Sequence, residues 1–159
     1  MPIDIPKDKW PGQVRTVTIG ATPEQGGTRQ KTVTVGGEKA LPFLHFEAEM
    51  PHTPVIAIEI VDRYPEDWSP LLLEAWGEAA NDPGTWAEAA EEAGADLLQL
   101  SLSLTGPDGE LTTPEAAVAV VKAVLEASGL PLLVYGPGQA EVDNELLVPV
   151  ANATKGERI

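Results

Sequence analysis

Two short runs near the start of the chain, residues 16–20 and 31–35, alternate between apolar and polar residues. β-branched residues dominate both runs, and a period of two places successive side chains on opposite faces of a β-strand. The connector over residues 21–30 has a proline and two adjacent glycines, which is typical of a turn-rich loop. The pattern therefore predicts a β-hairpin with a long loop, and we expect an extended arm over the proline-rich residues 1–13.

A longer run over residues 55–62, VIAIEIVD, is apolar almost throughout, as expected for a parallel strand that is covered on both faces. Residues 95–104 and 131–136 are two further runs that predict strands. The connection after the first of these strands is long, and it indicates a short helix around residues 71–80. We expect the last residues, 156–159, to begin a fourth strand.

Helix signals separate the predicted strands. Asp82 can cap a helix, Pro83 suits its first turn, and Gly94 is expected to end it. Between these residues, apolar positions recur at helical spacing. They are Trp86, Ala89, Ala90 and Ala93.

A second helix is expected to begin at Thr112, Pro114 and Glu115, which together resemble a capped start. A third helix lies within residues 141–153, and Pro149 falls inside it. Because a proline there removes a backbone hydrogen bond, it is expected to kink or split this helix. The buried stripe of the second helix is expected to consist of Val118, Val121, Val124 and Leu125.

The order of elements after the hairpin is β-α-β-α-β-α, which predicts a parallel sheet with right-handed crossovers. Such a sheet is either open and doubly wound or closed as a (β/α)₈ (TIM) barrel, and a barrel needs about 250 residues. The chain has 159 residues and would supply roughly the N-terminal half of one. We expect residues 1–54 to form the arm and hairpin and residues 55–159 to form a partial barrel with open strand edges.

Charge and composition exclude several classes of protein. The chain has 25 acidic and 10 basic residues, a net charge of −15, which argues against binding to nucleic acid. It contains no cysteine, so none of its residues can form a disulfide, a thiolate nucleophile, or a cysteine-ligated zinc or iron–sulfur site. No apolar run reaches the roughly 18 residues of a spanning helix. The first residues lack the order of a signal peptide, so we expect a cytoplasmic protein.

Candidate binding residues lie where the predicted parallel strands end, because ligands of such folds bind there. A carboxylate within an apolar strand, as at position 59, is either paired inside a barrel or functional. The serines of SLSL suit either packing or a site, and the GPG sequence is either a tight turn or a close approach to a ligand. The predicted binding residues are Glu59, Asp62, Ser101, Ser103, Thr105, Gly136 and Gly138.

The two histidines, His45 and His52, lie in the segment HFEAEMPH with Glu47 and Glu49. Their spacing fits no helical metal motif such as HExxH, so we predict no metal site and expect polar loop contacts instead. No GxSxG nucleophile elbow is present, and no catalytic residue is predicted.

Three segments of the chain resemble one protein family. They are VTIGATPEQGGTR, VGGEKALPFLHFEAEMPHTPVIAIEIVD and TPEAAVAVVKAVLEASGLPLLVYGPG. Together they are similar to the small subunit of corrinoid iron–sulfur proteins, which in archaea is the delta subunit of the acetyl-CoA decarbonylase/synthase complex. The glycine-rich hairpin and the LPFLHFEAEMPH segment are the most specific parts of the resemblance.

The resemblance implies a (β/α)₈ barrel in the anaerobic acetyl-CoA (Wood–Ljungdahl) pathway, within a carbon monoxide dehydrogenase complex. It implies a heterodimer whose large subunit holds both the corrinoid (cobalamin) and an iron–sulfur cluster. Methyl groups would pass from a methyl-tetrahydropterin through this corrinoid to the acetyl-CoA-forming site. The pterin methyltransferase and the acetyl-CoA synthase would then be transient partners, and this chain would contact the corrinoid in trans.

Two alternatives remain. The chain could be a pterin-dependent methyltransferase on a related barrel, which would need Asp or Asn residues at several strand ends. It could also be a truncated fragment without independent activity, or pair with a separate chain that provides the missing half of the barrel.

Overall fold

The structure is a computed structural model, and it describes residues 12–40, 48, 50–106 and 109–159. Contacts divide the chain into two compact units. One unit comprises the described part of residues 1–18 and 34–55, and the other comprises Ile19–Val33 and Ile56–Ile159. The larger unit contains a parallel sheet and the helices that cover it.

The predicted hairpin is confirmed. Strands β1 (Val17–Ile19) and β2 (Val33–Val35) form a small antiparallel sheet, and the hydroxyls of Thr18 and Thr34 lie 3.0 Å apart across it. A single 3₁₀ turn, η1 (Pro23–Gln25), lies in the long connector.

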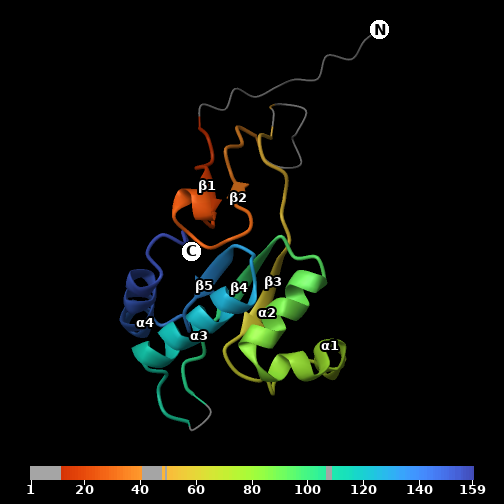
Figure 1. Cartoon of the computed structure of the whole chain (residues 1–159), viewed down its shortest axis with the longest axis vertical. Coiled ribbons are helices and arrows are strands. Elements are labelled where there is room, and N and C mark those ends of the chain that lie inside the picture. The colour runs from red at the N-terminus through yellow and green to blue at the C-terminus, as the bar shows by residue number, and fades with distance from the viewer. Residues whose placement is uncertain (1–11, 41–47, 49, 107–108) are drawn as a thin grey trace. The chain divides into compact units, whose positions relative to one another are not determined.

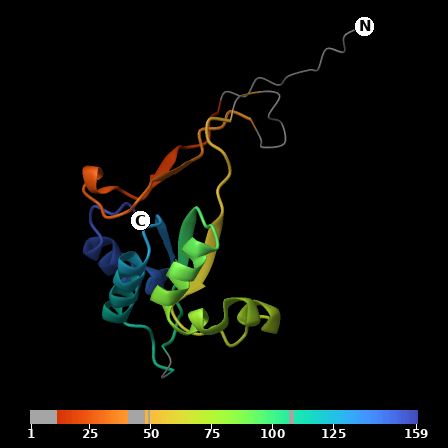
Figure 2. The ribbon, with the colours of Figure 1, turned by 45° about the vertical axis from the view of Figure 1, so that its right-hand side comes forward.

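The larger unit contains an open sheet of three parallel strands in the order β3-β4-β5. Sequential strands joined by right-handed crossovers place every connecting helix on the same face, and Figures 1 and 2 show α2, α3 and α4 covering one face of this sheet. The parallel βα order is therefore confirmed, and no closed barrel is seen in the described residues. The elements are β3 (Ala57–Val61), α1 (Pro70–Trp76), η3 (Gly77–Asn81), α2 (Pro83–Glu92), β4 (Leu97–Ser101), α3 (Pro114–Ala127), β5 (Leu132–Tyr135) and α4 (Ala140–Ala153).

The core lies between the sheet and these helices. Ile60, Leu98, Leu100 and Leu132 alternate along the strands and are at most 1% exposed. The intervening residues face away from the helices, and Glu59 is exposed among them. The expectation that residues 55–62 are covered on both faces is therefore wrong, because helices cover only one face of the sheet.

Two predictions about the helices need correction. The side chain that caps α3 belongs to Thr113, while the hydroxyl of Thr112 donates to the carbonyl of Ser103 (2.7 Å). Helix α4 continues through Pro149 without a break, because buried residues on either side of the proline, Leu146 and Val150, keep its inner face packed. None of the described helices is long and apolar enough to cross a membrane.

Residues 156–159 do not begin a strand. They follow a turn in which the Glu157 amide donates to the Thr154 carbonyl (3.1 Å), and the Arg158 carbonyl accepts a hydrogen bond from Gly20 (2.8 Å). The side chain of Glu157 also binds the backbone amide and the hydroxyl of Thr28, both at 3.1 Å. The end of the chain therefore binds the connector between β1 and β2 through the Arg158 carbonyl and the Glu157 side chain.

Asp82 caps α2 as predicted, and its carboxylate accepts hydrogen bonds from the Thr85 amide (2.8 Å) and hydroxyl (3.0 Å). These hydrogen bonds hold the pKa of Asp82 below its usual value. A lowered pKa in the folded state gives stability that is present above the unfolded-state pKa, about 3.9, and is lost as the pH falls.

We expect Asp82→Ala to lower the free energy of unfolding by about 1 kcal/mol at pH 7. The difference from wild type should shrink as the pH falls from about 5 toward the lowered pKa. Urea unfolding followed by circular dichroism at several pH values measures it. Asp82→Asn is the matched control, because its amide oxygen still caps the helix and does not titrate. A gap between wild type and Asp82→Ala that does not change with pH would contradict a role for the charge.

Candidate functional site

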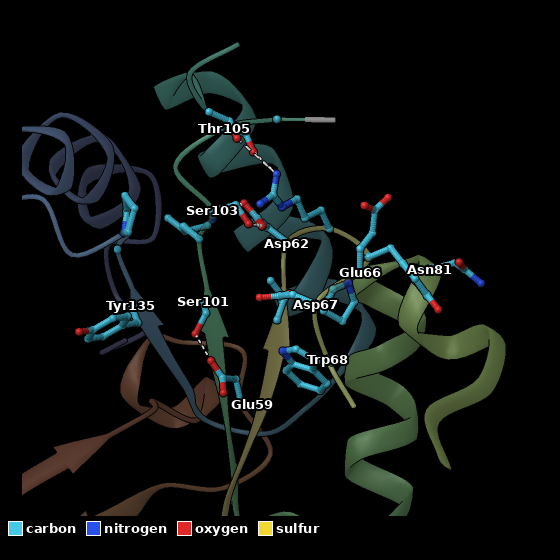
Figure 3. A pocket seen from close by; sticks show the side chains of 18 of the residues that line it. Glu59, Asp62, Glu66, Asp67, Trp68, Asn81, Ser101, Ser103, Thr105 and Tyr135 are labelled. Carbon is cyan, nitrogen blue, oxygen red and sulfur yellow. Dashed lines mark hydrogen bonds between the residues drawn. The ribbon is translucent and has the colours of Figure 1, made fainter. Parts of the chain in front are cut away.

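A broad cleft lies at the carboxyl ends of the three parallel strands (Figure 3). We call it the rim cleft; its volume is about 1010 Å³. This is at the upper end of the range of roughly 300–1,000 Å³ for ligand sites. Its size suits one face of a large ligand better than the enclosure of a small one. Six of the seven predicted binding residues line it: Glu59, Asp62, Ser101, Ser103, Thr105 and Gly136.

Glu59 and Ser101 lie on the sheet face that is turned away from the helices. The Ser101 hydroxyl donates to Oε1 of Glu59 over 2.6 Å, and Figure 3 shows the two side chains pointing toward each other. This contact arises from register, because Ser101 pairs with Val61, two residues after Glu59 on the neighbouring strand. The carboxylate therefore has a hydroxyl partner and still presents free lone pairs to the cleft.

Asp62 follows β3 directly and holds the loop after β4. Its two carboxylate oxygens accept hydrogen bonds from the amide (2.8 Å) and the hydroxyl (2.5 Å) of Ser103. Ser103 was predicted within the strand, but it lies beyond the end of β4, and so does Thr105. The Thr105 carbonyl and hydroxyl accept hydrogen bonds from Arg63 at 3.0 and 3.3 Å. These contacts fix two neighbouring loops at the edge of the cleft.

The GPG sequence forms the turn between β5 and α4. A side chain at Gly136 would place its Cβ 2.5 Å from Oδ1 of Asp143, and the same oxygen accepts the Gly138 amide (3.0 Å). The glycine at position 136 is therefore explained by the close approach of Asp143. Gly138 has a φ of +83° and is not among the residues that line the rim cleft.

Several residues of the cleft were not among the predicted binding residues. The missed carboxylates, Glu66 and Asp67, belong to the connection after β3, whose path no local pattern determines. Tyr135, by contrast, could have been found, because it pairs with Ser101 in the sheet register and is 60% exposed. The other missed residues with polar or aromatic side chains are Arg63, Tyr64, Trp68 and Asn81.

The rim cleft can accept hydrogen bonds and contact apolar or aromatic surfaces. Among the described residues, those that line it include four carboxylates, of Glu59, Asp62, Glu66 and Asp67, and one cation, Arg63. No histidine is among its lining residues, and no metal-binding group of three or more suitable side chains exists in the described part of the chain. The carboxylates can bind N–H donors, and the rings of Trp68 and Tyr135 can contact flat surfaces.

The histidine-containing segment is described only in part, and one further acidic residue, Asp96, lies at the other end of the parallel strands. Of the segment HFEAEMPH, residues 45–47 and 49 fall outside the described residues, so the prediction of polar loop contacts there stays a prediction. Asp96 lies at the amino end of β4, where it accepts the Ile56 amide (2.8 Å) and pairs with Lys31 (3.9 Å). It is not part of the rim cleft.

Comparison with known proteins agrees with the resemblance. Residues 16–159 match the family model described as CO dehydrogenase/acetyl-CoA synthase delta subunit. The acetyl-CoA decarbonylase/synthase complex subunit delta of Archaeoglobus fulgidus is 40% identical over an alignment of 158 residues. The alignment covers 96% of this chain and 34% of the relative. That of Methanosarcina mazei is 36% identical over 151 residues, 94% of this chain and 34% of the relative. The chain thus spans about a third of the length of these curated relatives.

The family match covers β1 through the end of the chain, and the identity to the relatives extends over the same elements. The resemblance seen in the sequence is confirmed: this chain belongs to the CO dehydrogenase/acetyl-CoA synthase delta subunit family.

Proposed function

We propose that this chain assists methyl transfer in an acetyl-CoA decarbonylase/synthase complex by covering the corrinoid of a large partner subunit with its rim cleft. The observation that supports the proposal is the open cleft of about 1010 Å³ at the carboxyl ends of parallel strands. The large subunit would form a heterodimer with this chain and would hold the iron–sulfur cluster. The pterin methyltransferase and acetyl-CoA synthase would be transient partners, all in the cytoplasm.

The lining of the cleft fits one face of a corrinoid. A corrin ring is wide and has amide side chains at its periphery, and carboxylates such as Glu59 and Asp62 accept hydrogen bonds from amide N–H groups. Ser101 and Gly136 are small and leave room for a flat surface.

When bound, the corrinoid supplies the cobalt atom that accepts and donates the methyl group. The residues of this chain would exclude water from that face, which protects a reactive centre from side reactions. Ser101 and Ser103 would keep Glu59 and Asp62 oriented, through the hydrogen bonds that they already donate. We also propose that the open sheet is one arc of a (β/α)₈ barrel, since its strands are sequential and its helices cover one face. The remaining strands could belong to the same polypeptide or to another chain.

The test is to mix the chain with a purified corrinoid iron–sulfur large subunit under anaerobic conditions. We expect a complex, and slower oxidation of the reduced corrinoid as followed by visible absorbance. Ser101→Phe should weaken binding about tenfold or more, because its ring would fill the cleft floor. Ala57→Phe is the matched control. It adds the same ring to the same face of the sheet, but at the amino end of β3, where residue 57 is exposed and does not line the cleft.

A wild-type chain that does not bind the large subunit would contradict the proposed function. If Ser101→Phe and Ala57→Phe both bound like wild type, a contact through the rim cleft would be wrong.

A second candidate is binding of the methyl-tetrahydropterin itself. This alternative needs Asp or Asn residues, and Asp62, Asp67 and Asn81 all line the cleft. Titration of a tetrahydropterin into the isolated chain, followed by quenching of tryptophan fluorescence, tests this alternative. Binding that Asp67→Asn and Asn81→Asp both weaken would favour it.

A further inference from the structure

The connection between β3 and α2 presents leucines to solvent. In helix α1, Leu71 is 76% exposed and Leu72 is 48% exposed, and none of the residues of this helix is buried. Single exposed leucines are common on soluble proteins. Here, however, two adjacent ones lie on a short helix that is fixed to the core at both ends. We call Leu71 and Leu72 the leucine patch.

Both ends of α1 are anchored on one buried ring. Trp68, just before the helix, packs edge-on against Trp86 with ring centroids 5.3 Å apart, and Trp76, its last residue, packs at 5.9 Å. Trp86 is fully buried in α2. The patch is thus preorganised, so ordering it on binding to a partner would cost little conformational entropy.

The direction of the patch follows from helical spacing. Leu73 and Trp76 are three residues apart and share the inner face of α1, where both are half-buried. Leu71 shares a different face with Glu74, and both are exposed. Figures 1 and 2 show α1 at the periphery of the larger unit, beyond the carboxyl end of β3.

The charge of the residues near α1 in the sequence favours one kind of partner surface over another. Residues 64–82, which include α1 and the two tryptophans that flank it, contain five Asp and Glu residues and no Lys or Arg. Opposite charge guides association, and like charge on both partners opposes it. A second copy of a chain with a net charge of −15 is therefore disfavoured as the occupant.

We propose that the leucine patch docks into an apolar recess bordered by Lys and Arg on the corrinoid-carrying subunit. The identity of this partner rests on the proposed function, but the contact is separate from the rim cleft. Exposed leucines would provide the apolar part of the interface, and the acidic residues around them would select a basic surface. Affinity for the subunit should fall as salt is raised, because screening weakens the charge attraction.

The experiment measures binding of the whole chain to the purified corrinoid iron–sulfur large subunit by isothermal titration calorimetry. The double variant Leu71→Asp/Leu72→Asp should weaken binding about 100-fold, because two apolar anchors are lost at once. Val148→Asp is the matched control, because Val148 is also exposed (56%) but lies on α4. The affinity of this variant for the large subunit should stay within about threefold of wild type. Circular dichroism should show the same fold in all three proteins.

Each other result contradicts the inference. If wild type binds and the double variant binds equally well, the leucine patch is not the contact, and the proposed function stands. An equal loss in Val148→Asp would also exclude a specific role for the patch. If wild type does not bind this subunit, both proposals are wrong. If wild type forms dimers in sedimentation and the double variant does not, a second copy occupies the patch instead.

Discussion

Replacing Arg29 with methionine should lower the free energy of unfolding by about 3–5 kcal/mol, because it removes one partner of a buried ion pair. Arg29 is only 2% exposed, and its Nε lies 3.2 Å from the carboxylate of Glu157. Its other nitrogens donate to the carbonyls of Leu125, Ser128 and Leu130, at and just after the end of α3. These carbonyls would lose their partner in the variant, and buried unpaired carbonyls are costly.

The expected loss is large compared with a typical total stability of about 5–15 kcal/mol. Urea denaturation followed by tryptophan fluorescence measures it, since the chain has four tryptophans. Arg29→Lys should fall between wild type and Arg29→Met, because an ammonium keeps the charge but cannot reproduce the forked donors of a guanidinium. The double variant Arg29→Met/Glu157→Gln should lose less than the sum of the single changes, since the two side chains are partners.

Lys31→Met is the control from the same connector. Lys31 pairs with Asp96 at 3.9 Å, and both side chains are more than 40% exposed, so the change should cost at most about 1 kcal/mol. Equal losses for Arg29→Met and Lys31→Met would show that the buried guanidinium does not hold the connector to α3. They would also contradict the assignment of Ile19–Val33 to the same compact unit as the sheet.

Most secondary structure could be predicted because it depends on neighbours in sequence. Asp82 caps α2 by accepting a hydrogen bond from the amide of Thr85, three residues later. Gly94 follows the end of α2 with a φ of +92°. The sequence could not predict the position of the connector. Arg29 contacts residues about 100 positions away, and an arginine in a glycine-rich loop gives no local sign of burial. Residues 156–159 were misjudged for the same reason, since their partners lie in that connector.

The candidate site was predictable in part, and for a physical reason. Parallel strands bring their carboxyl ends to one edge, so Glu59, Asp62 and Ser101 were expected to lie together there and do so. Their pairing was not predicted, because the hydrogen bond from Ser101 to Glu59 depends on strand register. Trp68 and the other residues after β3 reach the cleft through an irregular connection, for which periodicity gives no guidance.

Trp86 is the residue on which the leucine patch and the core both depend. Its ring is fully buried and contacts Trp68 and Trp76, which flank α1. Its Nε1 has no hydrogen-bond partner among the described residues. A buried N–H without an acceptor costs free energy, about 1–3 kcal/mol. The packing of the three rings therefore has to offset this cost.

Trp86→Ala should lower the free energy of unfolding by about 3–5 kcal/mol, because it leaves a cavity where two rings lose their contact. Trp86→Phe should cost much less, about 1.5 kcal/mol or below, since it keeps an aromatic ring and removes the unpaired N–H. Urea unfolding followed by circular dichroism distinguishes them without relying on tryptophan fluorescence. If Trp86→Phe were as damaging as Trp86→Ala, the expectation that a retained aromatic ring preserves the core would be wrong. Under conditions where Trp86→Ala stays folded, it should also bind the corrinoid-carrying subunit more weakly, because α1 would lose the anchor that orients Leu71 and Leu72.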